Sequence, residues 1–66
     1  MSTLTVAARA YFEGNVAKHK ANVALILANP VAVAEHPDII ETLEGELGKV
    51  AHYNDLLAAL TEVEQG

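Results

Sequence analysis

The sequence contains no cysteine and no tryptophan, and aromatic residues make up only 5% of its 66 positions. Without cysteine the chain can form neither a disulfide nor a thiolate zinc site, which are common stabilising elements of small domains. A chain of this size buries only about 60% of the surface that its unfolded form exposes, so its own core gives marginal stability. We therefore expect it to bury apolar side chains against copies of itself or against another protein.

Long apolar runs and clustered basic residues are also missing. No run approaches the roughly 20 apolar residues of a membrane span, and the N-terminus lacks the basic-then-apolar order of a signal peptide. Four Lys and Arg residues stand against nine Asp and Glu residues, and such scattered cations neutralise few phosphates. These absences predict a soluble intracellular protein that binds neither nucleic acid nor a membrane.

The charges that are present divide unevenly along the chain. Residues 1–30 contain three basic and one acidic residue, a net charge of +2, whereas residues 31–66 contain one basic and eight acidic residues, a net charge of −7. The acidic residues near the start of the second half are expected to form a solvated helix face. Alternatively, they form a docking surface for a basic partner, made of Asp38, Glu41, Glu44 and Glu46.

Two long segments carry apolar residues at helical spacing. The first runs from about residue 5 to residue 28, with Thr3 or Thr5 as its cap, and Asn29 before Pro30 ends it. Residues 29–36 are expected to form an extended connector. The second helix is expected over residues 37–62, with Pro37 as its first residue and His36 as its cap.

These segments predict an all-α fold, an antiparallel two-helix hairpin that assembles into a helical bundle as an oligomer. In the register that aligns the two stripes, His19 lies level with Val50. The chain forms a single domain, and no internal repeat is present. The expected core between the helices consists of Phe12, Val16, His19, Val23, Ile26, Ile40, Leu43, Leu47, Val50 and Leu57.

A second line on the first helix consists of small residues. Its members recur at spacings of 4 and 3 and lie about 160° from the core stripe. Such a line allows close approach of another helix, and we expect it to meet its own copy about a two-fold axis; the alternative is that alanine is simply a strong helix former. The expected self-association face is Ala10, Gly14, Ala17, Ala21, Ala24 and Ala28.

The residues that usually carry chemistry do not form a recognisable site. No histidine pair has the i, i+4 spacing of a helical metal motif. The alternative is a site shared by His19 and His52, which lie near the same level of the expected hairpin. Two helices enclose no cleft for a general acid or base. We expect no catalytic residue, no metal, no cofactor and no small-molecule substrate. Asn54 interrupts the apolar stripe, either as a buried amide that fixes the register or as a solvent-exposed residue.

Residues 29–41 (NPVAVAEHPDIIE), preceded by residues 17–23 (AKHKANV), resemble a family of short uncharacterised proteins of tailed bacteriophages, especially marine phages of cyanobacteria. The resemblance covers residues 10–60, and glycines often stand in that family where this chain has Ala32 and Ala34. The family has no assigned activity, so the resemblance implies a phage origin, in the host cytoplasm or the virion, without a mechanism.

The sequence thus predicts a non-enzymatic helical interaction module. In the leading interpretation it self-associates and docks on a larger protein assembly, as a virion or assembly component. In the alternative it is an acidic inhibitor or adaptor that binds a host protein through the carboxylates of the second helix.

Overall fold

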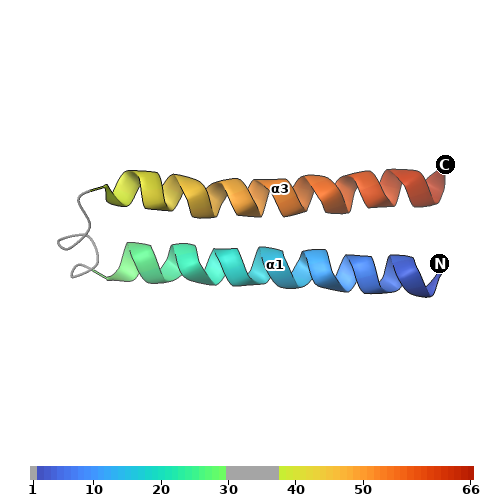
Figure 1. Ribbon diagram of the computed structural model, residues 1–66, viewed down its shortest axis with the longest axis horizontal. Helices are drawn as coiled ribbons and strands as arrows, with labels where there is room; N and C mark the ends of the chain where they lie inside the picture. The colour runs from blue at the N-terminus through green and yellow to red at the C-terminus, as the bar shows by residue number, and fades with distance from the viewer. Residues whose placement is uncertain (1, 30–37) are drawn as a thin grey trace.

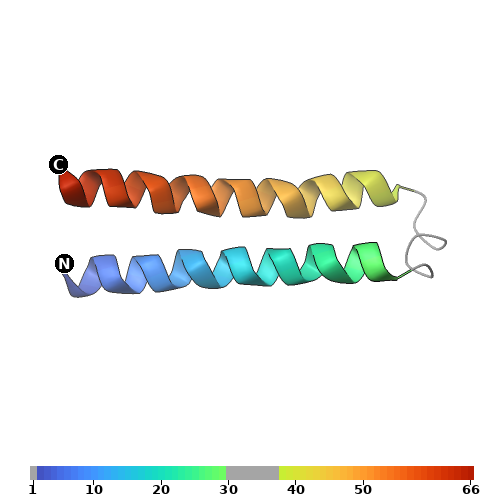
Figure 2. The ribbon, with the colours of Figure 1, turned by 180° about the vertical axis from the view of Figure 1, so that it is seen from behind.

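The computed structural model describes residues 2–29 and 38–66 of the chain. Two long helices, α1 (Thr3–Ala28) and α3 (Ile39–Gln65), lie side by side and antiparallel, with both termini at the same end (Figure 1). The view from behind shows the same pairing along the whole length (Figure 2). The predicted antiparallel hairpin is therefore confirmed. Within the two described ranges, neither helix has the long apolar sequence that crossing a membrane requires.

Helix α1 begins two residues earlier than the apolar pattern predicts. Its N-cap is Ser2, whose extended backbone directs the side-chain oxygen to accept a hydrogen bond from the Thr5 backbone N–H at 3.1 Å. The prediction of Thr3 or Thr5 as the cap is wrong, because both residues already lie inside the helix. The helix ends at Ala28 as expected, and Asn29 has left the helical conformation.

Helix α3 begins later and ends later than expected. Its N-cap is Asp38, whose carboxylate accepts a hydrogen bond from the Glu41 backbone N–H at 2.9 Å. A short side chain with a free acceptor suits this position, and Asp is among the best N-caps. The expected cap, His36, and the expected first helical residue, Pro37, lie outside the described residues, as does the connector from residue 30 onward.

The interface between the two helices, which we call the seam, runs along their full length. On α1 it contains the five expected core residues, all buried or half-buried. On α3 its members recur at spacings of 4 and 3, the pattern of antiparallel coiled-coil packing. They are Ile39, Leu43, Glu46, Val50, Tyr53, Leu57 and Leu60.

This seam corrects the expected core at two positions on α3. Ile40 is 71% exposed and Leu47 is 49% exposed, so neither lies between the helices. Turning α3 to bury them would also bring Asn54 into the seam, whereas the observed rotation brings in Tyr53 and Glu46, which find partners there. Asn54 is exposed, which agrees with the second of the two alternatives given for it, a solvent-exposed residue and not a buried amide.

The hairpin has almost no interior. Val16, at 9% exposure, is the one apolar residue of the described ranges that counts as buried, and no side chain there is fully buried. The Cα radius of gyration is 15.1 Å, against about 11 Å for a compact chain of this length. The molecule is a thin rod of 48 × 16 × 13 Å.

Candidate functional site

A charged hydrogen-bond cluster lies in the middle of the seam. The Glu46 carboxylate lies 2.6 Å from Nδ1 of His19 and accepts hydrogen bonds from the Asn22 side-chain amide at 3.2 and 3.3 Å. These hydrogen bonds, first the one with His19 and then the one with Asn22, hold the pKa of Glu46 below its ordinary value of 4.5. Hydrogen bonds to an ionised carboxylate are the stronger kind, so this cluster ties α1 to α3.

Aromatic rings surround Tyr53, two turns after Glu46 along α3. His19 stacks on the Tyr53 ring at a centroid distance of 6.1 Å, and Phe12 and Tyr11 lie at 6.2 and 6.3 Å. Partial burial, followed by the neighbouring Tyr11 phenol, raises the pKa of Tyr53. Because His19 contacts both Glu46 and Tyr53, it lies level with the residues midway between them, which agrees with the predicted pairing of His19 and Val50.

A third contact joins the helices near the termini. The Arg9 guanidinium donates hydrogen bonds to the Thr61 hydroxyl at 3.3 Å and to the Glu64 carboxylate at 3.0 Å. Arg9 belongs to the positive helix and Glu64 to the negative one, as the charge division predicts. The contact also shows which sides of the two helices adjoin, because Arg9 and Thr61 must lie on the same face of the hairpin.

The four carboxylates predicted as a docking face have different surroundings, and their role in docking stays a prediction. Asp38 caps α3, and Glu46 points into the seam. Glu41 and Glu44 are exposed on α3. Two of the four carboxylates therefore already accept hydrogen bonds within the hairpin, although Asp38 is also exposed.

The line of small residues on α1 faces away from α3. All six members are exposed, and a Cβ added at Gly14 would meet nothing within 4 Å. The hairpin itself therefore gives no reason for glycine at this position, which costs about 0.8–1 kcal/mol relative to alanine in a helix interior. The line is free to contact another molecule, and its role in self-association stays a prediction.

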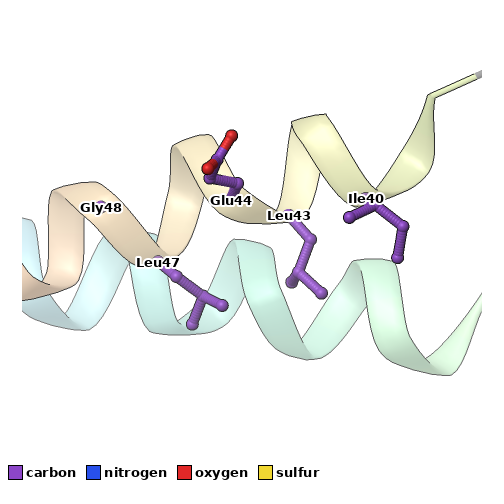
Figure 3. A pocket seen from close by; sticks show the side chains of 5 residues that line it. All are labelled: Ile40, Leu43, Glu44, Leu47 and Gly48. Atoms are coloured by element: carbon purple, nitrogen blue, oxygen red, sulfur yellow. The ribbon is translucent and has the colours of Figure 1, made fainter.

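An apolar groove opens on the side of α3 next to the seam. It has a volume of about 420 Å³ and is lined by Ile40, Leu43, Glu44, Leu47 and Gly48. In Figure 3 the side chains of Ile40, Leu43 and Leu47 form a row along one side of α3, while the Glu44 carboxylate points in the opposite direction. The rotation of α3 leaves Ile40 and Leu47, both expected in the core, outside the seam, and together with the seam residue Leu43 they form the apolar wall of the groove.

The histidines occupy different environments. His19 is 8% exposed and bonded to Glu46, whereas His52 is exposed and its ring lies edge-on to Tyr53 at 5.0 Å. Residues 2–29 and 38–66 contain no group of three or more His, Asp or Glu side chains arranged to hold a metal ion. Buried side-chain nitrogen and oxygen atoms in these ranges all have a hydrogen-bond partner.

Sequence reasoning missed the roles of Glu46 and Tyr53. Both stand on the 4-3 spacing that runs from Ile39 to Leu60, a repeat longer than the apolar stripe from Ile40 to Leu57. A search for apolar residues alone passes over this repeat because it contains a carboxylate and a phenol. The repeat length and the nearby His19 were the available signals.

Comparisons with protein-family models, with curated protein sequences and with solved structures give no match to this chain. The phage resemblance of residues 17–41 therefore stays a prediction. Function must be inferred from the side chains of the hairpin, and the features that stand out are its open apolar surfaces.

Proposed function

We propose that this protein is a non-enzymatic helical interaction module that self-associates and docks on a larger protein assembly. The observation that carries the proposal is the lack of an interior: Val16 is the one buried apolar residue among those described. Hydrophobic burial is the dominant favourable term in folding. A hairpin with so little of it needs a protein surface to cover its open faces.

The apolar side chains that a core would normally hide are on the outside of this hairpin. Eight large ones are between 49% and 78% exposed, and they occur on both helices and along the whole rod. A single exposed leucine is ordinary, but Ile40 and Leu47 adjoin in one apolar groove on α3, and clustered apolar surface on a small protein is typical of an interaction site. The eight are Leu4, Val6, Tyr11, Leu25, Leu27, Ile40, Leu47 and Val63.

The kind of partner follows from the same surface. The apolar groove on α3 suits another protein, and the excess of acidic residues opposes binding to nucleic acid. The phage resemblance supports a virion or an assembly intermediate as the larger structure. The alternative, an acidic inhibitor or adaptor of a host protein, has less support because two of its four proposed contact carboxylates are bonded within the hairpin.

The solution mass across a dilution series, measured by light scattering, tests the proposal. We expect a dimer or larger species that dissociates on dilution, with loss of helical circular dichroism as the hairpins separate. A monomer that keeps its helical signal at every concentration would contradict self-association. Raising the salt concentration should leave an apolar interface intact, whereas it would weaken contacts made by the α3 carboxylates.

A further inference from the structure

We infer that the groove on α3 is covered by α1 of a second copy, in a two-fold dimer whose connectors lie at the same end. The inference rests on the proposed self-association and specifies its surface. It assigns self-association to a face to which both helices contribute, in place of the line of small residues on α1. This dimer face consists of Leu27 on α1 and of Ile40, Leu43 and Leu47 on α3.

The contact between Arg9 and Thr61 shows that these residues share one face. Eighteen residues complete five turns of an α-helix, so Leu27 points the same way from α1 as Arg9. Leu43 likewise points the same way from α3 as Thr61. Since Arg9 donates a hydrogen bond to Thr61, Leu27 and the groove lie on the same side of the hairpin. Leu27 is 69% exposed.

The solvent-accessible area of the hairpin exceeds that of a compact protein of the same mass. The difference is about the area that each partner buries in a dimer interface. The accessible area is 4762 Å² for a mass of 7.0 kDa, whereas a compact chain of that mass exposes about 4,000 Å². The excess is roughly 700 Å², and standard interfaces bury about 800 Å² on each partner. One further hairpin laid against this face would remove the excess.

Charge decides which helix of the second copy covers the groove. Helix α1 contains three basic and one acidic residue, a net charge of +2, and α3 contains one basic and six acidic residues, a net charge of −5. A two-fold axis parallel to the rod lays each α1 on the α3 of the other copy. A two-fold axis across the rod would lay α3 on α3, and two helices of charge −5 repel each other.

The parallel axis also fixes which residues meet. Rotation about it leaves heights along the rod unchanged, so α1 of the second copy keeps the register of the first. His19 is level with residues 49–50, and Leu27, eight residues later, is therefore level with residues 41–42. Leu27 of the second copy thus faces the gap between Ile40 and Leu43 at the end of the groove. All neighbouring helices in the resulting four-helix bundle are antiparallel.

The first experiment places a charge in the groove. Leu47→Glu should weaken the dimer at least tenfold in a dilution series, because the carboxylate would have to be buried. The matched control is Leu25→Glu, since Leu25 is 68% exposed but lies on the other side of α1 from Leu27. It should keep the mass of the parent. Leu47 is half exposed in the single hairpin, so both variants can retain the helices.

A second experiment leaves the dimer face unchanged. The chain has no cysteine, so Gln65→Cys gives one spin-label site per copy, at the open end of the rod. Dimers with both connectors at one end should give a label separation within about 30 Å, because diagonal helices of a bundle are about 14 Å apart. Opposed rods would give about 40 Å or more, the length of a 27-residue helix.

The outcomes separate this inference from the proposed function. Three outcomes would overturn the dimer face but keep self-association. The oligomer remains intact in Leu47→Glu, it dissociates in Ala21→Glu, or the two spin labels lie at the long separation. A parent chain that is monomeric at every concentration overturns both. Dissociation by Leu47→Glu, retention in Leu25→Glu and the short separation together establish the face.

Discussion

Glu46 carries its carboxylate into a seam made otherwise of apolar, aromatic and amide groups. The His19 ring and the Asn22 amide bind it there, and they lower its pKa. A slipped pairing of the helices would separate these groups and leave polar atoms without partners, so one alignment is favoured over its neighbours. This is the role that sequence reasoning considered for Asn54, which lies on the surface.

The lowered pKa of Glu46 predicts a dependence of stability on pH. A carboxyl group whose folded-state pKa is depressed adds stability above its unfolded-state value, here 4.5, and loses that contribution as the pH falls through the lowered value. The parent should therefore melt at a higher temperature than Glu46→Gln at pH 6, and the gap should narrow below pH 4.5. Glu44→Gln, at an exposed carboxylate, should show no such gap; equal profiles for both variants would contradict the assignment.

Val16 allows a measurement of how much the small core contributes. Val16→Ala removes two carbon atoms from a site that is 9% exposed, and we expect a loss of about 1.5 kcal/mol in the free energy of unfolding. Val63→Ala makes the same chemical change at a 77% exposed position and should cost far less. Urea unfolding measures both, and equal losses would show that Val63 is covered as well as Val16.

At the scale of the elements, α3 depends on a side chain for its start. Asp38→Ala removes the acceptor of the Glu41 backbone N–H and should destabilise the protein by about 1 kcal/mol. Asp38→Asn keeps an acceptor of the same size and should cost little. The urea midpoints of the two variants test this, and a midpoint for Asp38→Ala as high as that for Asp38→Asn would contradict the capping role.

The two helices and their pairing follow from the sequence, because the apolar period and Asn29-Pro30 are local signals. The rotation of α3 does not, because it depends on which partners a side chain meets across the seam. A rotation of α3 that buried Ile40 and Leu47 would give a more apolar seam, but it would also bury Asn54 and leave Tyr53 outside the seam. Tyr53 gains contacts with rings of Tyr11, Phe12 and His19, and only the paired helices show this.

At the scale of the whole molecule, folding and association should be one process. A rod with a single buried apolar residue among those described gains much of its burial from a partner, so its melting temperature should rise with protein concentration. Circular dichroism melts at micromolar and near-millimolar concentrations test this, and we expect a rise of several degrees. A melting temperature that does not change would show that the isolated hairpin is stable.

The helical glycines of this rod can act as local reporters of coverage. A Cβ added at Gly14, Gly45 or Gly48 meets nothing within 4 Å, so alanine at an uncovered position should stabilise the protein by about 1 kcal/mol through helix propensity. Where a neighbouring backbone packs closely, the same methyl group should instead destabilise it. Gly48 borders the groove, Gly14 belongs to the line of small residues, and Gly45 borders neither. Whether each of the three glycine-to-alanine changes raises or lowers the free energy of unfolding therefore shows which sides of the molecule are in contact in solution.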